Sequence, residues 1–298
     1  MAKEMGRIVA GIGGNYDVLL ENGQILRLKA RGVFRKQGIT PLLGDRVTVP
    51  GDGYFDEILE RKNESIRPAA ANIDQMLVVF AARYPDPHFK LLDRFLIECD
   101  RRRSPCLIVF NKADLLSEEE RKRLQSVLTS YEKAGYEVEL VSTLEEGAKE
   151  TREKLLPRLA GKLTIFAGPS GVGKSSLINR LTDAVQETGD LSEKIARGKN
   201  TTRHARLLPV RQGGREMGLI GDTPGFSSFY MQQLSQEELA AAYPEFQPYL
   251  GKCRFTNCRH LRETDCAIRE AVLSGELSRV RYRNYVELLQ DMISGRRP

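Results

Sequence analysis

Hydrophobic and polar residues roughly alternate along the first 67 residues of the chain. Short alternating runs such as RIVAG, YDVLL and QILRLKA are separated by Gly-rich or Asn-Gly turns, including GIGGN and ENGQ. A period of two residues is typical of half-buried β-strands, and turns at this spacing favour hairpins. Five short strands within about 65 residues fit a small closed barrel. The pattern therefore predicts an OB-like β-barrel over residues 1–67, a fold that often binds oligonucleotides.

The pattern changes near residue 70. Continuous apolar runs (MLVVFAA, CLIVF, LTIFAG and GLIGD) now alternate with segments of helical character. Such strands, separated by helices, predict a parallel sheet covered on both faces. Ser117 and Glu120 form a Ser-x-x-Glu capping box that predicts the start of one of the helices. We expect a central α/β domain over residues 68–229.

Residues 230–298 have a mostly helical pattern. Ser235 and Glu238 form a second capping box, and apolar or aromatic residues recur at helical spacing in RVRYRNYVELLQDMI. The apolar stripe is expected to pack in a core. Arg279, Arg281 and Arg283 open this helix and have two interpretations, a solvated face or an RNA contact.

Charge is unevenly distributed in this chain of 298 residues with net charge +6. Residues 1–67 hold 11 basic and 9 acidic residues, residues 251–298 hold 10 and 6, and the middle is neutral. Basic ends fit contact with a polyanion, although a mildly basic soluble protein has the same charge. The segment ARGVFRKQGIT, with Phe34 among its cations, is either a phosphate-binding and base-stacking loop or a solvated hairpin loop.

Three features bear on the compartment. Five cysteines in a chain of this length argue against a disulfide framework and for a reducing environment. The apolar runs fall short of the roughly 18 residues that span a bilayer, and the first residues have no apolar leader region. We expect a cytoplasmic protein without membrane contact, acting as a monomer.

A phosphate-binding motif lies at residues 168–176. Gly168, Pro169, Ser170, Gly171, Val172, Gly173, Lys174 and Ser175 match G-x-x-x-x-G-K-[ST], and Ser176 follows them. The motif follows an apolar strand and precedes a helix, which is the context it requires. Backbone amides are expected to hold the phosphates, Lys174 to reach the β- and γ-phosphates, and the Ser175 hydroxyl to bind Mg²⁺. This phosphate loop alone does not exclude a guanylate-type kinase.

A candidate base-reading motif, Asn111, Lys112, Ala113 and Asp114, follows the apolar run CLIVF. The Asp114 carboxylate can accept hydrogen bonds from guanine N1–H and the exocyclic amine, a donor pair that adenine lacks. Asn111 can brace the loop and the stem of Lys112 can cover the base. Ser142, after a further strand, is a weaker candidate for the guanine side. We call residues 111–114 the NKAD loop.

The remaining nucleotide motifs follow the phosphate loop. Thr201 or Thr202 is expected to complete the Mg²⁺ shell, Asp222 to lie near the ion, and the Gly225 amide to meet the γ-phosphate. The set is complete for a guanine-nucleotide switch, but the NKAD loop precedes the phosphate loop, the reverse of the usual order. A circular permutation explains this order, because domain termini often lie close together.

A cysteine-rich cluster lies in the C-terminal region. Cys253, Cys258, His260 and Cys266 fall within fourteen residues, and a Cys₃His set is typical of a closed, structural Zn²⁺ site. We expect one zinc ion per chain. The alternative is a chance cluster of free thiols. Cys99 and Cys106 lie in predicted core segments and are expected to be small buried hydrophobes.

Taken together, these motifs resemble the RsgA family of circularly permuted, ribosome-dependent GTPases. The resemblance covers the whole chain: barrel, NKAD…GPSGVGKS…TT…DTPGF core and Cys₃His module. It implies GTP hydrolysis in late maturation of the 30S subunit, 16S rRNA as partner, and stimulation of turnover by the ribosome. Phe226 stands where many GTPases have a water-orienting Gln, and Asn200 where relatives tend to have His, so we assign no general base. A nucleotide-binding RNA-binding protein without turnover and a P-loop kinase are the alternatives.

Overall fold

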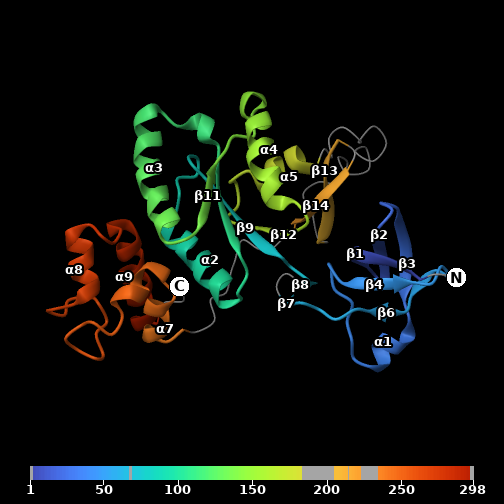
Figure 1. Cartoon of the computed structure of the whole chain (residues 1–298), viewed down its shortest axis with the longest axis horizontal. Helices are drawn as coiled ribbons and strands as arrows, with labels where there is room; N and C mark the ends of the chain where they lie inside the picture. The colour runs from blue at the N-terminus through green and yellow to red at the C-terminus, as the bar shows by residue number, and fades with distance from the viewer. Residues whose placement is uncertain (1–2, 67–68, 183–204, 214, 223–233, 296–298) are drawn as a thin grey trace. The chain divides into compact units, whose positions relative to one another are not determined.

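The computed structural model describes residues 3–66, 69–182, 205–213, 215–222 and 234–295 (Figure 1). The chain divides into two compact units, each built from two stretches of sequence. The first comprises Met1–Leu77 and Thr143–Ser227, and the second Val78–Ser142 and Ser228–Pro298. The three-domain division at residues 67 and 229 stays a prediction.

The N-terminal part of the first unit is the small β-barrel that the alternating pattern predicts. β1 is antiparallel to both β2 and β4, and β3 is antiparallel to β2. The two shortest strands, β5 and β6, pair with β3 and β4 respectively. Ile8, Val18, Val47 and Phe55 are fully buried in its interior. The strands are β1 (Glu4–Ile12), β2 (Asn15–Leu20), β3 (Ile25–Ala30), β4 (Arg46–Val49), β5 (Tyr54–Phe55) and β6 (Glu57–Ile58).

The basic segment between β3 and β4 differs from the stacking loop that the sequence suggested. Residues Gly32–Lys36 form a short helix, α1, and the Phe34 side chain is only 5% exposed. Its ring packs against Phe55, with the centroids 5.6 Å apart. The base-stacking role of Phe34 is therefore wrong, because its ring is buried in the barrel interior. Tyr54 is an accessible aromatic residue of this region: it is 39% exposed, and the Arg31 guanidinium lies over its ring.

In its described residues, the rest of the first unit contains a mixed sheet with helices α4 and α5. β12 and β14 are parallel, β13 and β14 form an antiparallel hairpin, and Ala10 of β1 pairs with Arg206 of β13. A separate two-stranded ribbon consists of β7 and β8. The bounds are β7 (Glu64–Ile66), β8 (Ala69–Ala71), α4 (Glu145–Leu159), β12 (Leu163–Ala167), α5 (Lys174–Thr182), β13 (Arg206–Gln212) and β14 (Arg215–Asp222).

The second unit combines the first strands of the α/β region with the C-terminal helices. β9 (Gln75–Ala81) runs into this unit from the first and is buried along its whole length, and the strand order there is β11-β10-β9. β10 (Cys106–Asn111) and β11 (Glu137–Leu140) are parallel, as predicted. α2 (Phe89–Arg101), the 3₁₀ turn η1 (Ala113–Leu115) and α3 (Glu118–Lys133) complete this part, and the Ser117–Glu120 capping box is confirmed.

The C-terminal part of the second unit is helical, as the sequence predicts. Its elements are α7 (Gln236–Ala241), the 3₁₀ helix η2 (Pro244–Tyr249), α8 (Ala267–Ser274) and α9 (Arg279–Ile293). The Ser235–Glu238 capping box starts α7. Tyr285 and Leu289 of the predicted apolar stripe are buried, in one cluster with Tyr243 and Phe246. Across the described ranges, no helix has the length and apolar character needed to cross a membrane.

Candidate functional site

The phosphate loop joins β12 to α5. Gly168, Gly171 and Gly173 have φ angles of 133°, 79° and 89°, in the region that residues with a Cβ rarely adopt. The Leu177 N–H donates to the Gly173 carbonyl at 2.9 Å, so the helix begins directly at the last glycine. Glycine turns followed by a helix N-terminus place backbone N–H groups and the positive end of the helix dipole at an anion site.

The side chains of the phosphate loop have distinct environments. The Lys174 amine donates to the Gly168 and Pro169 carbonyls at 2.8 and 2.6 Å. Ser175 and Ser176 are exposed in the first turn of α5, whereas Val172 is buried and anchors the loop. The Ser175 hydroxyl is therefore accessible to a cation bound beside the phosphates.

Asp222 ends β14 at the same edge of the sheet at which β12 leads into the phosphate loop. The two strands are parallel, with Ile165 opposite Gly221. A Cβ at Gly221 would lie 2.4 Å from the Ile165 side chain, so glycine allows the close packing of the two strands. The backbone thus brings residue 222 to the edge of the sheet at which the phosphate loop begins, and the expected position of Asp222 beside Mg²⁺ stays a prediction. Thr201, Thr202 and Gly225, like Asn200 and Phe226, lie outside the described residues.

The NKAD loop follows β10 in the second unit. Asn111 is fully buried at the end of the strand, and its carbonyl accepts from the Ala82 N–H at 2.7 Å. Lys112 has φ 65°, a left-handed conformation that is uncommon for a residue with a side chain and is often found at functional sites. Ala113 is held from both sides: its N–H donates to the Val141 carbonyl at 3.0 Å, and its carbonyl accepts from Arg121 at 2.9 Å.

Asp114 and Ser142 come together, which makes Ser142 a stronger candidate than its sequence context indicates. Asp114 is exposed, and the Ser142 hydroxyl donates to its Oδ1 atom. This hydrogen bond orients a carboxylate at the carboxyl end of a parallel strand, where α/β sheets bind ligands. An oriented carboxylate can accept the paired donors of a guanine edge.

The contact that holds the Lys112 side chain was not predicted from the sequence. The Lys112 amine donates to the carbonyl of Tyr84, a residue with φ 50° that is 63% exposed. The Arg83 guanidinium lies 4.9 Å from the Tyr84 ring centroid and pairs with Glu120 of α3. Tyr84 follows the apolar strand β9, but it acts through its backbone carbonyl, which its residue type does not reveal.

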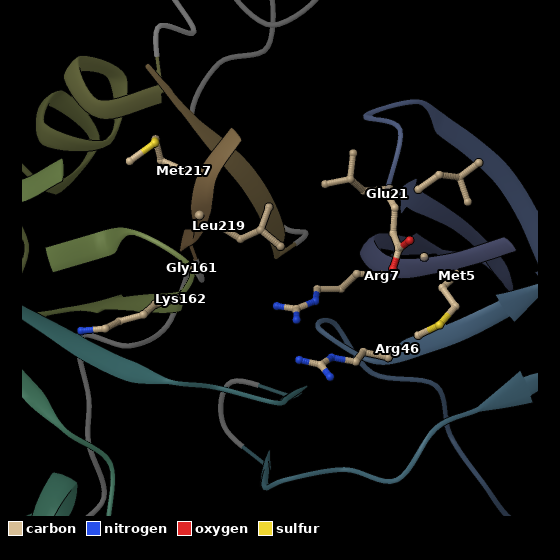
Figure 2. A pocket seen from close by; sticks show the side chains of 12 residues that line it. Met5, Arg7, Glu21, Arg46, Gly161, Lys162, Met217 and Leu219 are labelled. Carbon is tan, nitrogen blue, oxygen red and sulfur yellow. The ribbon is translucent and has the colours of Figure 1, made fainter. Parts of the chain in front are cut away.

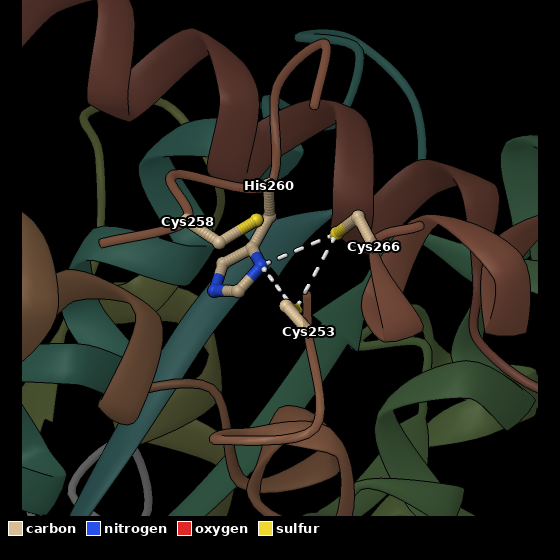
Figure 3. Close-up of side chains that lie close together, drawn as sticks. All are labelled: Cys253, Cys258, His260 and Cys266. Atoms are coloured by element: carbon tan, nitrogen blue, oxygen red, sulfur yellow. Dashed lines mark hydrogen bonds between the residues drawn. The ribbon is translucent and has the colours of Figure 1, made fainter. Parts of the chain in front are cut away.

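Cys253, Cys258, His260 and Cys266 converge on one point (Figure 3). Their candidate ligand atoms all lie within 4.8 Å of one another. Cys253 Sγ lies 3.5 Å from His260 Nδ1 and 3.8 Å from Cys266 Sγ. Zinc bonds of about 2.3 Å to sulfur and 2.0 Å to nitrogen put tetrahedral ligands roughly 3.5–3.8 Å apart, so these residues fit a zinc ion.

The backbone of this cluster is fixed by its surroundings. The Tyr282 and Tyr285 hydroxyls donate to the carbonyls of His260 and Arg259 at 2.6 and 2.9 Å. The Glu263 carboxylate accepts from three backbone N–H groups of residues 259–262 at 2.8–2.9 Å. Burial opposes the charge of Glu263, but these hydrogen bonds outweigh it and lower its pKa to about 2.

Burial makes charged forms of these groups costly while no ion is bound. Burial, together with the neighbouring thiols, raises the pKa of Cys258 to about 12, and burial lowers the pKa of His260. Burial also raises the pKa of Cys266, so ionisation of these two thiols is disfavoured in the protein alone. A divalent ion would stabilise the thiolates that these positions otherwise disfavour.

A further hollow of about 440 Å³ lies in the first unit, lined by barrel strands and by β14 (Figure 2). Arg7 of β1 and Arg46 of β4 are direct partners across the antiparallel pair, and their guanidinium groups project side by side. Lys162 also lines the hollow, but its amine donates to Gln75 at 3.0 Å. Glu21 lines the same hollow, which therefore holds one carboxylate beside the two guanidinium groups.

Comparisons with known proteins cover nearly the whole chain. A family model described as RsgA GTPase matches residues 58–232, and one described as RsgA N-terminal domain matches residues 5–53. The chain is 45% identical to a small ribosomal subunit biogenesis GTPase RsgA of Agathobacter rectalis, over 96% of this chain and 97% of that protein. It is 42% identical to the protein of the same name from Alkaliphilus metalliredigens, over 98% and 99%.

Two solved structures have similar folds. One is YloQ, described as a circularly permuted GTPase, with a TM-score of 0.76 and 33% identity over 100% of this chain and 97% of that chain. The other is YjeQ from Thermotoga maritima, with a TM-score of 0.77 and 30% identity over 98% and 99%. The permuted order of the nucleotide motifs agrees with this similarity.

Proposed function

The chain belongs to the RsgA GTPase family, and on this premise we propose that it hydrolyses GTP as a ribosome-stimulated switch in late maturation of the 30S subunit, with 16S rRNA as its macromolecular partner. The observation that carries this proposal is the pair of loops built for a guanine nucleotide. The phosphate loop supplies backbone donors at a helix N-terminus, and the NKAD loop supplies a carboxylate oriented by Ser142.

Each loop has a separate chemical task in this proposal. Lys174 and the backbone of residues 168–173 bind the β- and γ-phosphates, and Ser175 holds Mg²⁺ together with Thr201 or Thr202. Asp222 lies near the ion and Gly225 meets the γ-phosphate. The guanine base contacts Asn111, Lys112 and Asp114. Mg²⁺ held at this site would offset phosphate charge. The attacking water is positioned with help from the ribosome, because Phe226 stands where many GTPases have a water-orienting Gln.

Zinc has a structural role in this proposal. One Zn²⁺ per chain is held by Cys253, Cys258, His260 and Cys266, and four protein ligands leave no open position for substrate. Its binding contributes folding free energy, on the order of 10 kcal/mol for sites of this type. The ion fixes the loop between η2 and α8.

The ends of the protein provide its contacts with rRNA in this proposal. The Arg7–Arg46 pair presents two guanidinium groups on one face of the barrel, a geometry suited to backbone phosphates. The exposed ring of Tyr54 is suited to stacking with an unpaired base. The protein acts as a monomer in the cytoplasm.

The decisive experiment measures steady-state phosphate release from GTP, with ATP as control, with and without purified 30S subunits at defined salt. We expect slow, GTP-specific turnover that rises strongly with 30S subunits. If turnover is the same with and without 30S subunits, the GTPase activity stands and stimulation by the subunit is refuted. Transfer of the phosphate to added GMP, which forms GDP from the acceptor instead of free phosphate, would support a kinase in place of the hydrolase.

The zinc site has its own test. Cys258→Ala should remove most of the bound zinc, measured per chain by elemental analysis, and should expose α8 and α9 to protease. Cys106→Ala is the matched control because Cys106 lies at the start of β10, away from the cluster in sequence and fold. A metal-free Cys258→Ala protein with wild-type protease resistance would refute a structural zinc ion.

A further inference from the structure

Arg281 differs most from its expected role. From the sequence, Arg281 has two interpretations, a solvated or an RNA-binding arginine, but its side chain is only 2% exposed. The guanidinium lies between two tyrosine rings, 4.8 Å from the centroid of Tyr131 in α3 and 4.6 Å from that of Tyr243. Arg281 thus connects the C-terminal helices to a helix that begins just after the NKAD loop.

Arg281 pairs with two carboxylates, of which Asp93 is fully buried and Glu245 is mostly buried. Its Nη1 atom donates to Asp93 in α2 at 2.5 Å, and its Nε and Nη2 atoms donate to Glu245 at 2.7 and 3.1 Å. Burial opposes the charge of Arg281, but Asp93 and Glu245 outweigh it and hold its pKa well above the ordinary value. This arginine therefore stays charged at every pH at which the protein is folded.

Asp93 is fully buried and receives hydrogen bonds from both parts of the second unit. Tyr131 donates to its Oδ1 atom at 2.9 Å, while Asn284 and Tyr243 donate to Oδ2 at 2.9 and 3.2 Å. A buried carboxylate with this many donors has a single favourable arrangement. α2, α3 and α9 are consequently fixed relative to one another in the second unit (Figure 1).

The same helices reach the NKAD loop. The Phe89 ring, at the start of α2, lies 6.1 Å from Phe110 and 6.3 Å from Tyr131. Phe110 immediately precedes Asn111. From α3, Arg121 donates to the carbonyl of Ala113. A shift of α2 or α3 would therefore be transmitted to both ends of the NKAD loop.

α9 also reaches the zinc cluster. Tyr282, next to Arg281, donates to the carbonyl of the zinc-ligand candidate His260, and Tyr285 donates to that of Arg259. The Tyr285 ring contacts Tyr243, which is one of the two rings that enclose Arg281. α9 thus contacts the cysteine loop through Tyr282 and Tyr285. Through Arg281 it also contacts α2 and α3, the helices that reach the NKAD loop.

We propose that the Asp93–Arg281 pair and its partners (Tyr131, Tyr243, Glu245 and Asn284) position the NKAD loop for the guanine base, and that the zinc cluster and the base site are thereby coupled. The inference rests on the proposed binding of guanine nucleotide. Arg281 touches neither nucleotide nor metal and is a positioning residue. Coupling is reciprocal, so a guanine base bound at the loop retains zinc in the cluster, and zinc strengthens base binding.

The first test measures, at equilibrium, how much zinc the full-length, zinc-loaded protein releases to a competing chromophoric chelator. The chain is saturated with GDP, with inosine diphosphate, or with pyrophosphate, which occupies the phosphate loop without a base. We expect GDP to tighten zinc binding about fivefold or more, the lower range of typical coupling, and so to reduce zinc release. Inosine diphosphate, which lacks the exocyclic amine, should have a smaller effect and pyrophosphate none.

The second test uses Tyr131→Phe and Arg281→Met. Tyr131→Phe keeps the ring beside the guanidinium and removes one hydrogen bond to Asp93, so it remains informative if Arg281→Met fails to fold. Both should reduce the GDP effect on zinc release and the preference for GDP over inosine diphosphate, with pyrophosphate affinity unchanged. Arg283→Met, an exposed arginine on the same helix, is the matched control and should behave like the wild type.

The outcomes separate this inference from the proposed function. If GDP binds with the expected preference over inosine diphosphate, but zinc release is the same with GDP and with pyrophosphate, the coupling is absent and the GTPase proposal stands. If the chain shows no preference for guanine, the proposed function itself fails. If Arg283→Met reduces the coupling as much as Tyr131→Phe, the Asp93–Arg281 network is not its route.

Discussion

The phosphate loop and the NKAD loop solve different recognition problems with different parts of the chain. The phosphate loop uses backbone N–H groups, and its three glycines adopt positive φ angles at little cost. The NKAD loop uses side chains, and it keeps Lys112 in a left-handed conformation. The Lys112 amine donates to the Tyr84 carbonyl, and Arg121 of α3 donates to the carbonyl of Ala113. A backbone site is specified almost entirely by its own motif, whereas a side-chain site depends on neighbours elsewhere in the chain.

The largest expected effect comes from Lys174, whose charge reaches the phosphates in the proposed function. Lys174→Ala should weaken GTP and GDP binding by about 100-fold, because charge-assisted hydrogen bonds to phosphate are lost. Equilibrium binding with fluorescent GDP measures this. Unaltered affinity would refute the assignment of residues 168–175 as the phosphate-binding loop.

Asp114→Asn tests the NKAD loop directly. The amide cannot accept both guanine donors, so GDP affinity should fall roughly 10-fold to 100-fold, while xanthosine diphosphate should bind more tightly than it binds the wild type. Competition binding with both nucleotides gives the ratio. Unchanged base preference would remove Asp114 from the base-reading role and leave the loop without a specific function.

Ser142→Ala tests whether a side-chain site needs its supports. Losing one hydrogen bond to the Asp114 carboxylate costs about 1 kcal/mol, or roughly fivefold in GDP affinity. Pyrophosphate affinity should not change, because the phosphate loop is intact. Thr143→Ala, the neighbouring residue, is the control, and an equal loss in both variants would assign the effect to the strand end and not to the hydrogen bond.

The smallest effect is expected from the outermost support. Arg83 and Glu120 are each about one-third exposed, and ion pairs of this kind contribute about 0.2–1 kcal/mol. Arg83→Met should therefore weaken GDP binding about twofold, and added salt should weaken the wild type towards the variant. Arg123→Met removes a more exposed pair on the same helix and should leave GDP affinity unchanged.

The features predicted correctly from sequence are those encoded over short distances. The glycine turns of residues 168–173, the Ser117 and Ser235 capping boxes and the Cys₃His cluster are specified within about fifteen residues, and the structure places each as predicted. The alternation of residues 1–67 also predicts the barrel, since strand periodicity is local. The family resemblance added the function, which no local pattern specifies.

The missed features depend on residues far apart in the chain. Arg281 looked like one of three surface arginines because its partner Asp93 is 188 residues away. Phe34 lies among cations in the sequence, yet tertiary packing on Phe55 decided its position. Tyr84 supports Lys112 through its carbonyl, which every residue type possesses, so its identity carried no signal. Long-range packing and backbone contacts leave little trace in a single sequence.

The pairing of Asp93 with Arg281 determines when this part of the protein can finish folding during translation. During translation α2 and α3 leave the ribosome long before α9, so the nascent chain carries a carboxylate destined for a buried position without its cation. The part that carries the NKAD loop cannot complete its core until residue 281 has been synthesised. If this loop binds guanine as proposed, binding must wait until the four candidate metal ligands, which precede residue 281 in the sequence, have also been made.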